Sequence, residues 1–352
     1  MTIQQMLQYV VENNASDLHL VPGTMPLVRI DGVLIPVAGE KMLGEAEVNQ
    51  LLSGVVSAEQ KQMFEVNKEM DFSFSFGDKA RFRVNAYYQK GLVAASFRLI
   101  PSKIPEIDAL SLPKICHDFV KLKQGFILVT GPTGQGKSTT LAAILDEINR
   151  TRPVHIISIE DPIEYVYTPA KALISQREVH NDTHSWEIAL RSVLREDPDV
   201  VLIGEMRDFE TIAAALTIAE TGHLVFATLH TNSAAQTIDR IVDVFPENQQ
   251  PQVRMQLSAN LEAVFSQRLV NKVGGGRVVA YEIMVGTHAV RTSIREGRTH
   301  MLDNIIQTSS EYGMRTLEMS LAELVNQGEI TMETAMAFAF RPEDVTRYIK
   351  GE

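Results

Sequence analysis

The spacing of hydrophobic positions changes near residue 100. Over residues 3–13 apolar side chains recur at helical spacing, and 45–69 repeats that pattern. Asp31-Gly32 separates two apolar runs and predicts a hairpin turn. Strand-like runs lie at residues 17–20, 27–30, 33–37, 72–76, 81–88 and 92–100. Residues 1–100 therefore predict a small α+β domain.

Beyond this region the pattern becomes that of an α/β nucleotide-binding core. Residues 101–114 contain Pro101, Pro105 and Pro113 and no periodicity, which predicts a linker. A second domain is expected over 115–352, with a helical carboxyl-terminal region over about 287–352. Apolar runs separated by helical stretches predict a mostly parallel sheet, with strands at 125–130, 155–159, 200–203 and 224–229 and helices that include 138–149, 289–295 and 316–327.

Composition narrows the class of protein. A hydrophobic fraction of 45% and a charged fraction of 22% are typical of a globular chain. The apolar runs are strand-sized, far short of the roughly 20 residues that a membrane helix needs. The amino terminus has no secretory signal pattern, so we expect a cytoplasmic protein. The only cysteine, Cys116, excludes an internal disulfide, and a net charge of −11 argues against non-specific nucleic-acid binding.

A phosphate loop lies between a predicted strand and a predicted helix. Its glycines allow backbone N–H groups to close around phosphates, and the helix amino terminus adds partial positive charge. Lys137 reaches the β and γ phosphates, and Ser138 can ligate Mg²⁺. The loop residues are Gly131, Pro132, Thr133, Gly134, Gln135, Gly136, Lys137 and Ser138.

Acidic residues follow two of the predicted core strands. Segment 199–205 is an apolar strand that ends in Glu205, where a carboxylate can polarise the metal-bound or the attacking water. Glu160, Asp161 and Glu164 follow run 155–159. Three carboxylates beside a triphosphate suit metal coordination or water activation; a solvated acidic loop is the alternative. The candidate Mg²⁺ ligands, directly or through water, are Ser138, Glu160 and Glu205.

Two histidines bracket the predicted strand 224–229. In an extended run His223 and His230 lie roughly 20 Å apart, too far to share a metal ion. His230, with Thr228 and Thr231, is a candidate sensor of the γ-phosphate, and a structural role is the alternative. His180 and His184 fall in a predicted loop and are expected at the surface.

Arginines on the amino-terminal strands offer a third kind of candidate. Period two places Arg81 and Arg83 on one face, and Arg98 lies on the following strand. They form either a salt-bridged sheet face or a cluster that reaches the phosphates of a neighbouring subunit, where positive charge stabilises the transition state. Arg195 and Arg207 compete for that second role, and the sequence leaves the choice open.

Together these motifs resemble the secretion-superfamily ATPases, and within them the PilT-type retraction ATPases of type IV pili. The resemblance extends from segment 16–20 to segment 289–296, nearly the whole chain. It rests on the loop 131–140, which adds Thr139 and Thr140, the acidic box 159–165, the segment 204–208 and the histidine box 221–231.

The resemblance implies a homohexameric ring in which each subunit links a PAS-like amino-terminal domain to a RecA-like P-loop ATPase domain, with ATP bound between the two. It implies that Lys137 and Ser138 hold phosphate and Mg²⁺. It also implies that Glu164 and Glu205 are the catalytic carboxylates, which of them activates water being open. The remaining implied site residues are His223 and His230 of the histidine box and, for contacts across the ring, Arg81, Arg83 and Arg98.

The implied function is ATP hydrolysis that powers pilus retraction and twitching motility. The implied partners are the inner-membrane platform protein of the pilus and the assembly ATPase or accessory retraction ATPase. The implied location is the cytoplasmic face of the inner membrane at the pilus base, with peripheral membrane contact and no nucleic-acid partner.

Alternatives differ in specific features of the sequence. Thr292-Ser293 stands where the retraction family usually carries asparagine-leucine, so a PilU-type accessory ATPase is the first alternative. Pilus-assembly and type II secretion ATPases usually add an amino-terminal domain and a four-cysteine zinc module, neither of which is seen here. Two further alternative functions are a RecA-like nucleic-acid motor and a scaffold that binds ATP without hydrolysing it.

Overall fold

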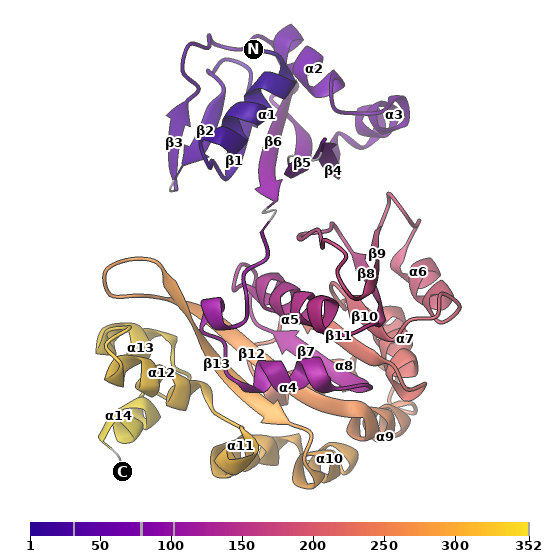
Figure 1. The fold of residues 1–352 in the computed structure, drawn as a ribbon, viewed down its shortest axis with the longest axis vertical. Helices are drawn as coiled ribbons and strands as arrows, with labels where there is room; N and C mark the ends of the chain where they lie inside the picture. Colours follow the sequence, from indigo (N-terminus) through magenta and orange to yellow (C-terminus); the bar gives the residue numbers. More distant parts are fainter. Residues whose placement is uncertain (31, 78–79, 101–102, 351–352) are drawn as a thin grey trace. The chain divides into compact units, whose positions relative to one another are not determined.

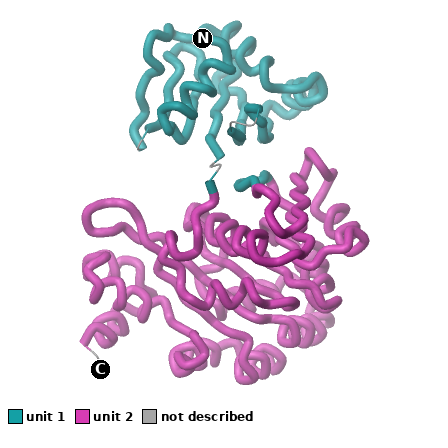
Figure 2. Tube along the Cα trace, in the orientation of Figure 1, with its two compact units in different colours: residues 1–103, 162–166 teal, residues 104–161, 167–352 magenta. Residues whose placement is uncertain are grey.

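The computed structural model describes residues 1–30, 32–77, 80–100 and 103–350. Asp31 and Pro101, named above for a turn and a linker, lie outside these ranges. The chain divides into two compact units, residues 1–103 with 162–166 and residues 104–161 with 167–352 (Figure 2). Among the described residues, no helix is both long enough and apolar enough to cross a membrane.

The first unit contains an antiparallel sheet. Its strands are β1 (Asp17–Leu20), β2 (Leu27–Ile30), β3 (Val33–Pro36), β4 (Glu69–Phe76), β5 (Ala80–Gln89) and β6 (Leu92–Ile100). Among the described residues these six strands lie in the order β3-β2-β1-β6-β5-β4 (Figure 1). The pairing of Ile30 with Val33 confirms the predicted hairpin.

One face of this sheet is buried under helices. The helices are α1 (Ile3–Glu12), α2 (Glu45–Ser53) and α3 (Ala58–Asn67). Leu18, Phe82 and Phe97 have no exposed surface and share a core with these helices, because alternate strand residues point to one face. The helical stretch predicted over 45–69 is interrupted, since the Ser57 hydroxyl accepts a hydrogen bond from the Gln60 N–H and begins a new helix.

The second unit contains a mixed sheet whose centre is parallel. Its strands are β7 (Gly125–Thr130), β8 (His155–Glu160), β9 (Leu173–Glu178), β10 (Val200–Ile203), β11 (Leu224–Leu229), β12 (Leu261–Asn271) and β13 (Arg277–Val285). Among the described residues the order is β13-β12-β7-β11-β10-β8-β9 (Figure 1). All neighbours are parallel except β12 and β13, which pair antiparallel. The predicted α/β core with a mostly parallel sheet is confirmed.

Helices cover both faces of this sheet. Phe126 and Leu128 of β7 share a core with helices of the 186–260 segment, whereas α5 contacts β7 without belonging to that core. The helices before residue 287 are α4 (Ile115–Lys121), α5 (Lys137–Thr151), α6 (Trp186–Val193), α7 (Phe209–Glu220), α8 (Ala234–Asp243) and α9 (Gln250–Asn260).

The carboxyl-terminal region is helical, as predicted. Buried residues of its last three helices pack on Val270, Val278 and Ala280 of the β12–β13 hairpin. The helices are α10 (His288–Arg295), α11 (Leu302–Thr308), α12 (Leu317–Asn326), α13 (Met332–Phe338) and α14 (Pro342–Lys350), with short 3-10 turns at Thr299–Met301 and Ser310–Tyr312.

Three core strands were not predicted. β9 lies at the sheet edge with most of its residues only partly buried, so its sequence lacks an apolar run. In β12 and β13 the buried polar residues Gln267 and Glu282 interrupt the hydrophobic pattern. Tertiary pairing with β7, which periodicity cannot reveal, makes this hairpin part of the sheet.

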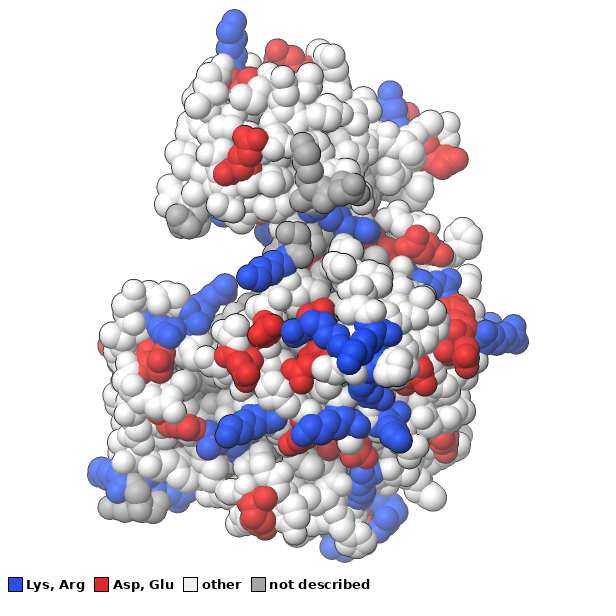
Figure 3. Space-filling view, in the orientation of Figure 1, with Lys and Arg blue, Asp and Glu red and all other residues white. Residues whose placement is uncertain are grey.

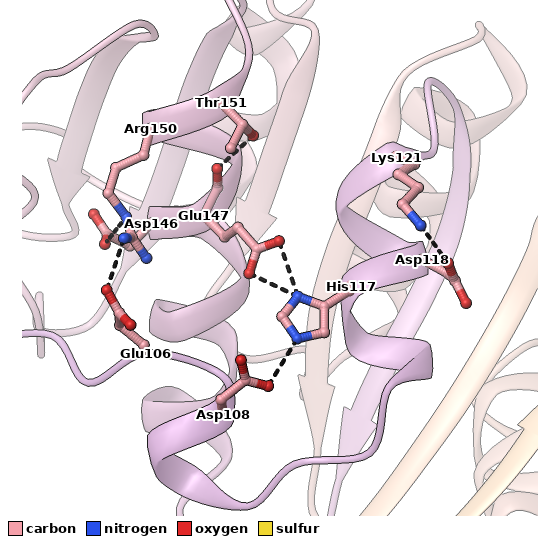
Figure 4. Close-up of polar contacts among 9 residues, drawn as sticks. All are labelled: Glu106, Asp108, His117, Asp118, Lys121, Asp146, Glu147, Arg150 and Thr151. Atoms are coloured by element: carbon pink, nitrogen blue, oxygen red, sulfur yellow. Dashed lines mark hydrogen bonds and ion pairs between the residues drawn. The ribbon is translucent and has the colours of Figure 1, made fainter.

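The described part of the predicted linker contains a 3-10 turn, η1 (Asp108–Leu110), and is tied to α5 (Figure 4). Glu106 accepts from Arg150 at 2.9 Å. His117 on α4 lies between two carboxylates, 3.0 Å from Glu147 on α5 and 3.1 Å from Asp108. The hydrogen bonds to Glu147 and Asp108 raise the pKa of His117.

Candidate active site

Four parallel strands end at the same edge of the second sheet. Leu128 of β7 pairs with Ala227 of β11, which pairs with Ile203 of β10, which pairs with Ile159 of β8. Nucleotides bind at the carboxyl edge of such sheets. Glu160, which ends β8, therefore shares this edge with the residues that follow the other three strands, Gly131, Gly204-Glu205 and His230.

The phosphate loop needs glycine at two of its turns. Gly131 has φ 141°, and a Cβ there would lie 2.4 Å from the backbone oxygen of Gln267. Gly136 has φ 81° and precedes the first residue of α5. Both backbones occupy a region that side chains rarely adopt. The loop therefore turns tightly between β7 and α5 and presents the helix amino terminus, including Ser138, at the sheet edge.

Lys137 is 8% exposed, and its ammonium lies over the loop. Its Nζ donates to the backbone oxygens of Gly131 at 2.8 Å and Pro132 at 3.0 Å. Nζ also lies 3.4 Å from Nδ1 of His230. The lysine of the motif is thus held at the phosphate position by the loop that would cradle the phosphates.

Glu205 is bound to two cationic or titratable partners. Oε1 and Oε2 accept from Arg207 Nε and Nη2, each at 2.7 Å, and Oε1 lies 3.0 Å from Nε2 of His230. The predicted residues Lys137, His230, Glu205 and Arg207 therefore form one chain of contacts. The sequence predicted each member separately but not their order.

Neighbouring charges shift the pKa values of these contacting residues. Burial by itself would raise the pKa of Glu205, yet the hydrogen bond from Arg207 and the charges of His230, Arg207 and Lys137 lower it. Burial, followed by the charge of Lys137, lowers the pKa of His230. The hydrogen bond that Arg207 donates to Glu205 raises the pKa of Arg207. Glu205 is therefore ionised, and His230 favours the neutral form near neutral pH.

The acidic box is divided between the two units. Glu160 ends β8, is 8% exposed and accepts from the Ser158 hydroxyl at 2.6 Å. It lies against Gly204, where a Cβ would come within 3.2 Å of the Glu160 Cα, so Glu160 adjoins the start of the Glu205 segment. Glu164 is exposed and lies in segment 162–166, which belongs to the first unit. Its catalytic role stays a prediction.

The two histidines of the histidine box lie at opposite ends of β11. His230 follows the strand and reaches the phosphate loop. His223 precedes it, and its Nδ1 contacts the backbone oxygen of Ile218 at 3.0 Å. Within this chain His223 is therefore not brought to the phosphate loop, and its predicted nucleotide contact is untested. His180 and His184 are exposed outside helices and strands, as predicted.

The amino-terminal arginines share the sheet face opposite the helices. Arg83 pairs across the strands with Arg98, and Arg98 pairs with Asp17. Arg98 donates to Asp17 at 2.9 Å with 71% of its side chain exposed, and Arg83 forms an ion pair with Asp71. Arg81 donates to the Ser73 hydroxyl at 2.6 Å. The expected common face is confirmed, while any contact across a ring stays a prediction.

The remaining predicted residues have simpler surroundings. Arg195 is exposed, and no ion pair to it is seen within the described ranges. Cys116 is fully buried, and burial raises its pKa to about 12, so it is an inert core residue as expected. The side-chain oxygen of Gln135 accepts from the Leu269 N–H at 2.6 Å and is thus directed to β12.

The profile of the type II/IV secretion system proteins matches residues 1–275. The chain belongs to this family. The PilT retraction ATPase of Pseudomonas aeruginosa is 49% identical over 98% of this chain and 100% of its own length. A twitching motility protein of Neisseria gonorrhoeae is 48% identical over 91% of this chain and 86% of its own. The predicted resemblance to PilT-type ATPases is confirmed.

Solved structures of family members share the fold. A crystal structure of the pilus retraction motor PilT with bound ADP superimposes with a TM-score of 0.92 at 47% identity, covering 99% of each chain. The ATPase DotB of Legionella pneumophila gives a TM-score of 0.84 at 27% identity, covering 96% of this chain and 95% of its own. Both likenesses extend through the two units described above.

Proposed function

We propose that this chain is an ATP-hydrolysing motor subunit whose homohexameric ring drives type IV pilus retraction and hence twitching motility. One observation carries the proposal: the phosphate-loop lysine, His230 and Glu205 form a contact chain at the carboxyl edge of the sheet. The relative with 49% identity over 98% of this chain is a retraction ATPase, and ADP is bound in the solved PilT structure. These findings support nucleotide hydrolysis coupled to retraction.

The residues divide the reaction between them. Residues 131–140 bind the phosphates, and Lys137 exchanges its loop carbonyl partners for phosphate oxygens when ATP enters. Glu205 orients or deprotonates the attacking water, because its lowered pKa keeps it ionised. Its bidentate partner Arg207 must release it for that step. Glu164 is the alternative water-activating carboxylate.

The oxygen donors present suit Mg²⁺. The Ser138 hydroxyl and the carboxylates of Glu160 and Glu205 are hard oxygen ligands of the kind that Mg²⁺ takes together with phosphate oxygens and water. Glu160 ends β8 and Glu205 lies just after the adjacent parallel strand β10, so both are available at one edge. When bound, Mg²⁺ would neutralise charge on the phosphates.

The domain assignment and the partners complete the proposal. We assign residues 1–100 to a PAS-like domain, 101–114 to a linker and 115–352 to a RecA-like ATPase domain. The ring would act on the pilus platform protein at the cytoplasmic face of the inner membrane, together with the assembly or accessory retraction ATPase. The neighbouring subunit would be contacted by Arg81, Arg83 and Arg98. As part of the histidine box, His223 would contact the nucleotide.

Two alternatives have less support. The PilU ATPase of Pseudomonas aeruginosa is 40% identical, below the 49% of PilT. For a nucleic-acid motor we would expect a basic surface, whereas acidic and basic side chains are interspersed over the larger unit on the face in Figure 3. Retraction is therefore the favoured function.

The test compares steady-state ATPase activity of wild type and Glu205→Ala over a range of protein concentrations, with oligomer mass followed by light scattering. Activity should rise as hexamer forms, and Glu205→Ala should bind nucleotide without turnover. Glu187→Ala removes an exposed ion pair with Arg191 on α6 and is the matched control. Activity in a monomer would refute the ring-motor mechanism, and turnover by Glu205→Ala would move the water-activating role to Glu164. Pilus retraction is then scored in cells that carry either variant.

A further inference from the structure

Gln267 on β12 contacts the phosphate loop with both its backbone and its side chain. It is 1% exposed. Its backbone oxygen occupies the space beside Gly131, where a Cβ would approach within 2.4 Å. Its side-chain Nε2 donates to the backbone oxygen of Gln135 at 2.6 Å and would lie 3.3 Å from a Cβ at Gly136. One buried residue thus reaches the beginning, the middle and the end of the loop.

Gln135 returns the contact. Its Oε1 accepts from the backbone N–H of Leu269 at 2.6 Å. Both the backbone oxygen and the side-chain oxygen of Gln135 therefore accept hydrogen bonds from β12. The parallel pairing of β12 with β7 ends at Ser266 and Thr130, directly before the loop. The Gln267–Gln135 brace continues the attachment of β12 along the loop after the strand pairing has stopped.

The brace is anchored to a rigid strand. Gln267 lies within β12 and pairs with Tyr281 of β13. The other side-chain atom, Oε1 of Gln267, is buried and has no hydrogen-bond partner among the described residues. A buried unpaired acceptor destabilises the folded protein. A leucine at position 267 would avoid that penalty. The advantage of an amide at this position is therefore the hydrogen bond that Nε2 donates to Gln135.

We propose that Gln267 is a positioning residue that holds the phosphate loop open through Gln135, so that its backbone N–H groups face the phosphates before nucleotide arrives. The inference rests on the proposed nucleotide binding. Backbone donors that are already oriented bind an anion without the entropy of ordering a glycine-rich loop. Loss of the brace should therefore weaken binding of the phosphates rather than the folding of the sheet.

The experiment measures affinity for a fluorescent ADP analogue with the intact wild-type chain, two single variants, their combination and a control variant. Gln267→Leu removes the donor at nearly constant volume, and Gln135→Ala removes the return contact from a partly exposed position. We expect each to weaken ADP binding about 3- to 10-fold, the loss of one neutral hydrogen bond. The double variant should bind ADP at least as weakly as the weaker single variant, because it removes both hydrogen bonds between β12 and the loop. Gln307→Leu, which removes an amide bonded to Tyr348, is the matched control and should bind as wild type.

A positioning role also predicts a split in the kinetics. KM for ATP should rise with the Kd for ADP while kcat changes less than about threefold, because the contact is the same in ground and transition states. The melting temperature without nucleotide should match the control. Gln267→Glu keeps the shape but lacks the N–H donor, so it should weaken ADP binding as Gln267→Leu does.

The outcomes separate the brace from the proposed function. If wild type binds no ADP, the proposed function fails. If wild type binds and both Gln267→Leu and Gln135→Ala bind equally well, the brace is refuted. If Gln267→Leu does not fold, Gln135→Ala decides the matter, since the brace requires this variant to fold and lose affinity.

Discussion

Nε2 of His230 lies 3.0 Å from Oε1 of Glu205, on the opposite side of the ring from the lysine ammonium. An ammonium can only donate, and an ionised carboxylate can only accept. A neutral imidazole with its proton on Nε2 accepts from Lys137 at Nδ1 and donates to Glu205. The lowered pKa of His230, caused first by burial and then by Lys137, favours this neutral form. His230 thereby links the phosphate-binding lysine to the carboxylate.

Glu205→Gln tests the role of the carboxylate charge. The variant keeps the side-chain shape and removes the base, so nucleotide affinity should stay within about threefold while kcat falls at least about 100-fold. Both are measured by fluorescent nucleotide titration and phosphate release. Glu187→Gln, on exposed helix α6, should match wild type. Wild-type turnover by Glu205→Gln would transfer the role to Glu164.

Arg98 and Arg29 allow a matched test of contacts across the ring. Both lie near Asp17, at 2.9 Å and 3.7 Å, so either substitution leaves Asp17 one arginine partner. Arg98 has 71% of its side chain exposed, against 36% for Arg29, and is therefore the more accessible of the two. If Arg98 contacts a neighbouring phosphate, Arg98→Ala should lower kcat about 10³-fold with hexamer mass unchanged. Equal losses in Arg29→Ala would point to a structural role instead.

The His117 bridge between the linker and α5 should stabilise the fold only while His117 is protonated. Its pKa is raised, first by the hydrogen bond to Glu147 and then by Asp108. The stabilisation is therefore complete below the unfolded value of about 6.5 and is lost as pH rises through the higher folded value. At pH 5.5 His117→Gln should melt below wild type by the equivalent of about 1 kcal/mol or less. At pH 9 the variant and wild type should melt at the same temperature. His184→Gln is the exposed control; a loss at pH 9 as large as at pH 5.5 would contradict the bridge.

Glu282 should make stability fall as pH rises. Burial raises its pKa to about 7 although its Oε1 accepts from the Ala234 N–H at the start of α8, and Asp303 and Glu318 add to the rise. Its ionisation therefore opposes folding between about pH 4.5 and pH 7, by up to about 3 kcal/mol. Glu282→Gln keeps the acceptor and should melt above wild type, with a gap that widens from pH 5 to pH 8. A constant gap, or the same behaviour in the exposed Glu296→Gln, would refute the assignment.

How much the sequence predicts depends on whether the signal is local. β7, β10 and β11 were predicted at their observed bounds because continuous apolar runs of four to six residues mark buried parallel strands. The break between α2 and α3 was missed because the cap at Ser57 is a single side-chain contact. β12 and β13 were missed because the buried polar residues Gln267 and Glu282 interrupt the apolar pattern of their strands.

The sequence by itself determined the phosphate loop and its chemistry, because glycine spacing, a lysine and a hydroxyl act within eight consecutive residues. It also determined the parallel core, through continuous apolar runs separated by helical stretches. Only the tertiary structure decided which distant side chains meet. Lys137 and His230 are separated by 93 residues, and Gln267 and Gln135 by 132. Strand order brings such pairs together, and strand order depends on packing between elements, which no local pattern of residues encodes.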